Sequence, residues 1–188
     1  PIIVRLEEGA DMPAVAEGTI IATEKTDSES ESNAVEINLE KDIELTDVML
    51  LDRNTIINGN GHKITSSATR IIRITKGDIE VTFNNVNFVS RTVMQYPNDI
   101  RGVSIDNVQN VVLTLNQCSV DFTDASACDW AYAVNQSGDN SSNNTIVING
   151  GTYEGANVIN IWGSNHKINI DGAVVATVLS DKSFGRFV

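Results

Sequence analysis

The sequence predicts an all-β protein built as a solenoid, in which short strands of successive coils stack upon one another. Five segments superpose without gaps over their centres, each follows an alternating apolar and polar pattern, and the stretches between them carry no amphipathic helical pattern. Alternation with a period of two indicates strands with one buried face, and their Val, Ile and Thr content agrees with this. The repeat therefore decides the fold class.

The five segments share an apolar residue, then Asn or Asp, then a residue that tolerates a turn. They read IINGNGH (56–62), TFNNVNF (82–88), TLNQCSV (114–120), VINGGTY (147–153) and NIDGAVV (169–175). The aligned polar residues lie 22 to 33 residues apart, a coil length and not a hairpin length; they are Asn58, Asn84, Asn116, Asn149 and Asp171. We expect a column at a bend, because an Asn amide can bond both the local backbone and the amide one coil away.

A second alternating strand precedes four of these segments, at 70–75, 102–106, 132–136 and 158–162. Alternation predicts the inward positions of both strands: Ile57, Phe83, Leu115, Ile148 and Ile170 in one, and Ile72, Ile74, Val103, Ile105, Tyr132, Val134, Ile159 and Ile161 in the other. After the bend, one further inward column is expected at Val86, Cys118, Gly151 and Ala173. The glycines that follow the column of polar residues, Gly59, Gly150 and Gly172, are expected to supply positive φ.

This pattern resembles the right-handed parallel β-helix superfamily named after the pectate and pectin lyases. The resemblance covers residues 35–178, and the stretch IINGNGHKI (56–64) is similar to a coil motif frequent in that group. It implies a right-handed parallel β-helix of roughly five to seven coils. The group includes polysaccharide lyases, glycoside hydrolases, phage tailspikes and adhesins, and in its enzymes sugar chains lie in the groove over the first strand.

The two ends of the chain are expected to differ. Residues 1–34 are predicted to hold a short N-terminal cap, with a helix over 11–18, a strand over 18–23 and a polar loop over 26–32. Residues 35–188 are predicted to form one continuous β-helix, which could be a fragment of a longer protein. The apolar C-terminal strand lacks a polar cap, so a flanking domain or a second copy of the chain is expected to cover that open end.

Composition narrows the class of partner. The chain has 25 acidic and 13 basic residues and a formal charge of −12, which disfavours nucleic acid. No apolar run approaches the ~18 residues of a membrane-spanning helix, so membrane insertion is not expected. Two cysteines are too few for a disulfide framework, and Cys118 is predicted in the core and Cys128 in a loop. An extracellular or cell-surface location is expected from the resemblance.

Candidate ligand contacts lie on the outward face of the first strand and on the loops that enter it. The loops at 90–101 and 123–131 are expected to lie side by side through stacking, and a Trp beside amide and carboxylate groups suits sugar binding. The outward positions are predicted to be Arg73, Thr75, Ser104, Asp106, Ala133, Asn135, Asn160 and Trp162. The predicted ligand-binding residues are Trp162, Asn160, Asn135, Trp130, Asp129, Tyr96 and Asp99.

The sequence favours a non-catalytic module that binds a polysaccharide or other glycan, or a structural or adhesin segment. The alternative is a polysaccharide lyase or glycoside hydrolase domain acting on acidic polysaccharide, with Asp106, Arg73 and Arg101 as catalytic candidates. A hydrolase needs two carboxyl groups roughly 5 to 10 Å apart, and Asp106 is the only acid on that strand face.

No metal or other cofactor is expected, except that the lyase alternative implies Ca²⁺ through the resemblance. The two histidines, His62 and His166, do not have the spacing of paired metal ligands. Both are expected to have structural or solvent-facing roles.

Overall fold

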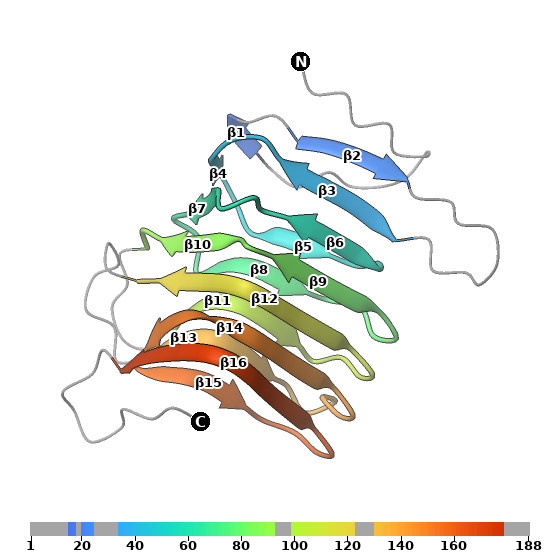
Figure 1. Ribbon diagram of the computed structural model, residues 1–188. Coiled ribbons are helices and arrows are strands. Elements are labelled where there is room, and N and C mark those ends of the chain that lie inside the picture. The colour runs from blue at the N-terminus through green and yellow to red at the C-terminus, as the bar shows by residue number, and fades with distance from the viewer. Residues whose placement is uncertain (1–14, 18–19, 25–33, 93–98, 123–129, 179–188) are drawn as a thin grey trace.

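The computed structural model describes residues 15–17, 20–24, 34–92, 99–122 and 130–178 of the chain. Within these residues every regular element is a strand, and the strands form two sheets (Figure 1). The all-β prediction is therefore confirmed for the described part of the chain. None of these residues forms a helix that could cross a membrane.

The smaller sheet, here sheet B, has five strands and the larger, sheet A, has eleven. Sheet B comprises β5 (Met49–Leu51), β8 (Arg70–Ile74), β11 (Ile100–Asp106), β13 (Ala131–Ser137) and β15 (Asn157–Ile161). Sheet A comprises β1 (Val15–Glu17), β2 (Ile20–Glu24), β3 (Val35–Leu39), β4 (Ile43–Leu45), β6 (Thr55–Asn58), β7 (Lys63–Ser66), β9 (Glu80–Asn84), β10 (Asn87–Ser90), β12 (Val112–Asp121), β14 (Thr145–Gly155) and β16 (Lys167–Val178).

The chain passes alternately between the two sheets, and each structural repeat adds one strand to sheet B and then its strands to sheet A. Between repeats the pairing is parallel in both sheets, as in β8 with β11 and β12 with β14. Early repeats enter sheet A as two short strands, such as β9 and β10, whereas β12, β14 and β16 are single long strands that curve around the molecule (Figure 1). Sheet A consequently curls into a half-barrel that faces sheet B.

The first two strands pair differently from the rest. β1 runs antiparallel to β4, and β2 runs antiparallel to β3. The helix expected over 11–18 is wrong at Val15–Glu17, because these residues form β1 and pair with the edge of sheet A. Of the strand expected over 18–23, residues 20–23 lie in β2, and residues 18–19, like the polar loop expected over 26–32, lie outside the described residues.

The core lies between the two sheets and is built from columns of like side chains. Along one column of sheet A, Ile57, Phe83 and Leu115 are in register and fully buried, and Ile148 continues the column. Phe83 and Phe88 meet edge to face with ring centroids 5.1 Å apart. Each repeat therefore covers the apolar side chains of the one before it, which is the main stabilising contribution of a stacked fold.

The last repeat departs from two expectations. Ile170 continues the column of Ile148 but is 42% exposed, because none of the described residues packs on its outer side as Ile148 packs on Leu115. Ala173 does not continue the column of Cys118 and Gly151: a register shift in β16 brings Val174 opposite Gly151, and Ala173 is exposed.

The bend in sheet A carries a ladder of side-chain amides. Asn84 Nδ2 lies 2.8 Å from Asn58 Oδ1, Asn116 Nδ2 lies 2.8 Å from Asn84 Oδ1, and Asn149 Nδ2 lies 2.7 Å from Asn116 Oδ1. Asn58 extends the ladder by donating to Asn38 Oδ1 at 2.9 Å. Asp171 is in register with Asn149, but it has no amide hydrogen to donate, and its Oδ1 accepts from the backbone of Gly172.

In four repeats the residue that follows the aligned Asn or Asp adopts positive φ. These residues are Asn85, Gln117, Gly150 and Gly172. Gly59 is the exception, since positive φ falls instead on Asn60 and Gly61. Gly59 is required for a different reason: a Cβ there would lie 2.4 Å from the backbone oxygen of Asn85. Its prediction as a positive-φ position is thus wrong.

Candidate functional site

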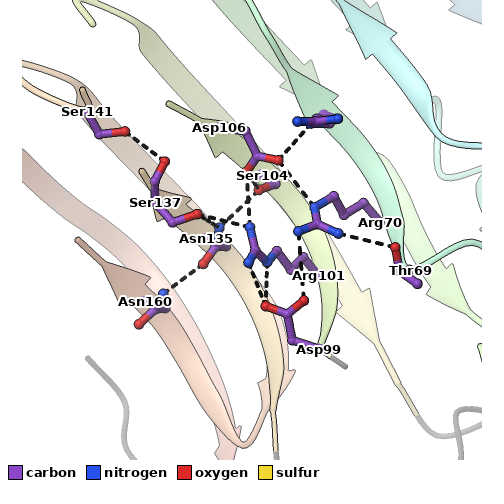
Figure 2. A network of polar contacts seen from close by, with 11 residues as sticks. Thr69, Arg70, Asp99, Arg101, Ser104, Asp106, Asn135, Ser137, Ser141 and Asn160 are labelled. Carbon is purple, nitrogen blue, oxygen red and sulfur yellow. Dashed lines mark hydrogen bonds and ion pairs between the residues drawn. The ribbon is translucent and has the colours of Figure 1, made fainter. Parts of the chain in front are cut away.

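The outer face of sheet B carries five charged side chains that contact one another, here named the arginine cluster: Arg70, Arg73, Asp99, Arg101 and Asp106. Arg73 Nε lies 2.8 Å and Arg70 Nε 3.2 Å from Asp106 Oδ2, while Arg101 Nη1 lies 3.2 Å from Asp106 Oδ1. Arg101 also binds Asp99, with Nη2 and Nε at 2.6 and 2.8 Å from one carboxylate oxygen (Figure 2). The cluster therefore joins β8, β11 and the residue just before β11.

The carboxylate of Asp106 is the centre of the cluster. Its side chain is only 8% exposed, and the Ser104 hydroxyl also donates to it. Three guanidinium groups against two carboxylates leave one net positive charge, in a chain whose formal charge is −12. Arg73 is the most exposed member, at 45% of its side chain, so the cluster presents a guanidinium to solvent and keeps its central acid covered.

Asn135 lies in register between Ser104 and Asn160 on the same face. It is fully buried, its amide nitrogen donates to the hydroxyls of Ser104 and Ser137 at 3.0 and 3.1 Å, and its oxygen accepts from Asn160 Nδ2 at 2.7 Å (Figure 2). Asn135 is therefore an interior link between the arginine cluster and β15, and not a surface contact. Ser104 and Ala133, also predicted at outward positions of the strand, are likewise fully buried.

Trp162 and Asn160 form the exposed part of the face at its last strand. Trp162 is 65% exposed, and Asn160, two residues earlier, is half-buried and uses one amide hydrogen on Asn135. Gln136 is in register with Ile161, so the next residues along the two strands, Ser137 and Trp162, come level. The hydroxyl of Ser137 accepts from Arg101 Nη1 at 3.0 Å, which links the neighbourhood of Trp162 to the arginine cluster.

Trp130 lies at the other end of sheet B. It directly precedes β13 and is 37% exposed, whereas Trp162 directly follows β15. At about 3.3 Å per residue, the length of β13 separates the backbones of the two tryptophans by roughly 20 Å along the sheet. The structure does not bring the two tryptophans together, and the expected contacts Tyr96 and Asp129 lie outside the described residues.

His62 lies between β6 and β7 of sheet A, away from this face, whereas His166 follows Trp162 by four residues and its Nδ1 accepts from the backbone N–H of Asn144 at 3.2 Å. His62 Nδ1 is 3.3 Å from Asp42 Oδ1, and the backbone N–H of Lys63 donates to the same oxygen at 2.9 Å. The hydrogen bond from the Lys63 N–H lowers the pKa of Asp42, and the contact with His62 lowers it further. Among the described residues, no three His, Cys, Asp or Glu side chains converge as a metal site.

Sequence reasoning missed Arg70, Ser137 and Gln136. Arg70 precedes the alternating core of β8, so alternation does not assign its side chain to a face, although it pairs with Asp106. Gln136 falls by alternation on the inward face of β13, and a polar residue at an inward position was a signal that could have singled it out.

Comparisons of the chain with models of known protein families, with curated proteins and with solved structures gave no significant match.

Proposed function

We propose that the protein is a right-handed parallel β-helix module, of the kind named after the pectate and pectin lyases, that binds carbohydrate without transforming it. The parallel pairing of successive repeats in both sheets supports the β-helix. Parallel crossover connections are right-handed in about 98% of cases, which supports the hand. The location that accords with this proposal is extracellular or at the cell surface.

The exposed indole of Trp162 is the observation that carries the binding proposal. Large aromatic side chains are normally buried, and Trp162 is 65% exposed beside the amide of Asn160. An indole covers the apolar C–H face of a sugar ring, while an amide bonds its hydroxyls. The guanidinium of Arg73, three strands away on the same face, offers a contact to a more distant part of an extended glycan.

The geometry of the arginine cluster favours binding over catalysis. Both oxygens of Asp106 are engaged by guanidinium groups or by the Ser104 hydroxyl, so neither is free to act as a general acid or nucleophile. The N–H groups of Arg73 and Arg101 donate to carboxylates, whereas a lyase base must offer a lone pair that accepts a proton. Asp106, Arg73 and Arg101 are accordingly proposed to stabilise the face.

Titration calorimetry with cellohexaose and with hexagalacturonate, alongside a glycan array, tests the binding proposal. Trp162→Ala is expected to weaken binding at least about tenfold, which corresponds to 1.4 kcal/mol, with an unchanged melting temperature because the side chain is exposed. Val175→Ala, at an exposed apolar side chain of sheet A, is the matched control. Absence of any glycan signal from the parent chain would leave a structural or adhesin segment as the function.

The lyase alternative has its own readout. Elimination in a polyuronate creates a conjugated double bond, so incubation with polygalacturonate, with and without Ca²⁺, would raise the ultraviolet absorbance if the chain were a lyase. We expect no rise. A rise that is lost in Arg73→Ala would replace the binding proposal with the enzyme.

A further inference from the structure

Gln136 interrupts an apolar column in the core. On the inward face of sheet B, Ile74, Ile105, Gln136 and Ile161 are in register in successive strands. Gln136 is fully buried, and its Oε1 has no hydrogen-bond partner. A buried, unpartnered amide oxygen costs about 1 to 3 kcal/mol, so an isoleucine would be expected there on grounds of stability alone.

The side chain of Gln136 bonds to the backbone of Trp162. The side-chain Nε2 of Gln136 donates to the backbone oxygen of Trp162 at 3.2 Å, and the backbone N–H of Trp162 donates to the backbone oxygen of Gln136 at 3.0 Å. Both backbone polar groups of Trp162 are therefore bound by one residue. Trp162 lies beyond the end of β15, where ladder bonds to a neighbouring strand would otherwise stop.

The residue after Trp162 restricts the backbone from the other side. Gly163 has φ of +121°, and a Cβ there would lie 2.3 Å from the backbone oxygen of Ser141. The chain can therefore pass close to Ser141 only because the residue is glycine. Ser164 N–H then bonds the same Ser141 oxygen at 3.2 Å.

We propose that Gln136 is a positioning residue that holds the backbone of Trp162, so that the exposed indole keeps one orientation for its ligand. The inference rests on the proposed function for the ligand, but the restraint on Trp162 can be measured without any ligand. A fixed aromatic ring loses less conformational entropy on binding than a mobile one, so loss of the restraint is expected to weaken binding.

The test uses Trp130→Phe as the parent, so that Trp162 is the only tryptophan whose fluorescence is measured. Gln136→Met keeps the length of the side chain and removes both the donor and the unpartnered oxygen. Time-resolved anisotropy is expected to show faster local motion of Trp162, and the dissociation constant for cellohexaose or hexagalacturonate is expected to rise about threefold to tenfold. The melting temperature is expected to stay the same or to rise. If Gln136 only stabilised the fold, the melting temperature of Gln136→Met would fall.

Ile105→Met is the matched control, since Ile105 occupies the same column, is fully buried and makes no side-chain bond to Trp162. Unchanged anisotropy in Gln136→Met, or an equal change in Ile105→Met, would overturn the positioning role. Faster motion in Gln136→Met, combined with binding that Trp162→Ala leaves intact, would uphold the restraint and refute the sugar contact of Trp162.

Discussion

The side-chain nitrogen of Asn116 lies 2.8 Å from the side-chain oxygen of Asn84, which stands 32 residues earlier in the chain. Asn116 in turn accepts from Asn149 at 2.7 Å. Each interior member of the ladder donates to one neighbour and accepts from the other. A half-buried amide is thereby satisfied by its equivalents in adjacent repeats, and strand register is fixed by polar as well as apolar contacts.

Replacement of Asn116 by Leu is expected to lower the free energy of unfolding by about 1 to 3 kcal/mol, because Asn84 and Asn149 both lose a partner. Urea titration measures this. Asn169→Leu, at an exposed position of β16, is the control and should change stability by less than about 0.5 kcal/mol. Equal effects of the two substitutions would remove the ladder from the account of stability.

Asp106→Asn is expected to destabilise the protein by about 2 to 5 kcal/mol, since three guanidinium groups would lose their shared and largely buried counter-charge. Asp52→Asn is the matched control, because Asp52 pairs with Arg53 in the open, at side-chain exposures of 59% and 43%. An exposed pair contributes about 0 to 1 kcal/mol. A chemical denaturation series in low and high salt separates the two cases, and similar losses in both variants would contradict a central role for Asp106.

The buried thiol of Cys118 predicts a loss of stability in alkali. Burial raises the pKa of Cys118 from 9.0 to about 11. Between these values the unfolded chain has released the thiol proton and the native chain has kept it, so stability is complete below about pH 9 and falls by roughly 2 to 3 kcal/mol as the pH rises through 11.

Cys118→Ala, compared with the parent from pH 8 to 11 in a Cys128→Ser background, should lower stability at pH 8 and flatten this decline. Burial also raises the pKa of Tyr153, which adds a decline of the same sign in both proteins and so largely cancels in the comparison. Parallel pH profiles for parent and variant would show that the native thiol titrates freely. Cys128 lies outside the described residues.

The exposed apolar side chains of β16, the last strand of sheet A, indicate self-association. Ile170 and Val175 of β16 are 42% and 57% exposed, although the column of Ile170 is buried in earlier repeats. The isolated chain is expected to self-associate with rising concentration in sedimentation velocity, and Val175→Lys should weaken this. Leu50→Lys, at 54% exposure on sheet B, should not. A monomer at all concentrations would argue against self-association through β16.

Local pattern predicts the strands that flank the bend and four members of the ladder. The segments around Asn58, Asn84, Asn116 and Asn149 carry both the apolar alternation and the turn residue, so their strands and bends follow from short stretches of sequence. Asn38 was missed because Leu39 follows it instead of a turn residue. The antiparallel pairing of β1 also escaped prediction, since it depends on an available sheet edge and not on local propensity.

The site was less predictable, because alternation gives the face of a residue and not what covers it. Alternation places Asn135 on the outer face of sheet B, but its burial depends on neighbouring side chains such as Ser104 and Ser137. The pairing of Arg70 with Asp106 depends on the path of long side chains across two strands. Neither property is encoded by the spacing of residues along the chain.

The amide ladder has a consequence for how this chain can change length. Consecutive partners are separated by 20, 26, 32 and 33 residues, yet their nitrogen and oxygen atoms stay 2.7 to 2.9 Å apart. The geometry of the bend therefore does not depend on how many residues separate two consecutive members of the ladder. Whole repeats can be duplicated, and recognition loops grafted between them, while the same amide contacts restore the alignment of the scaffold.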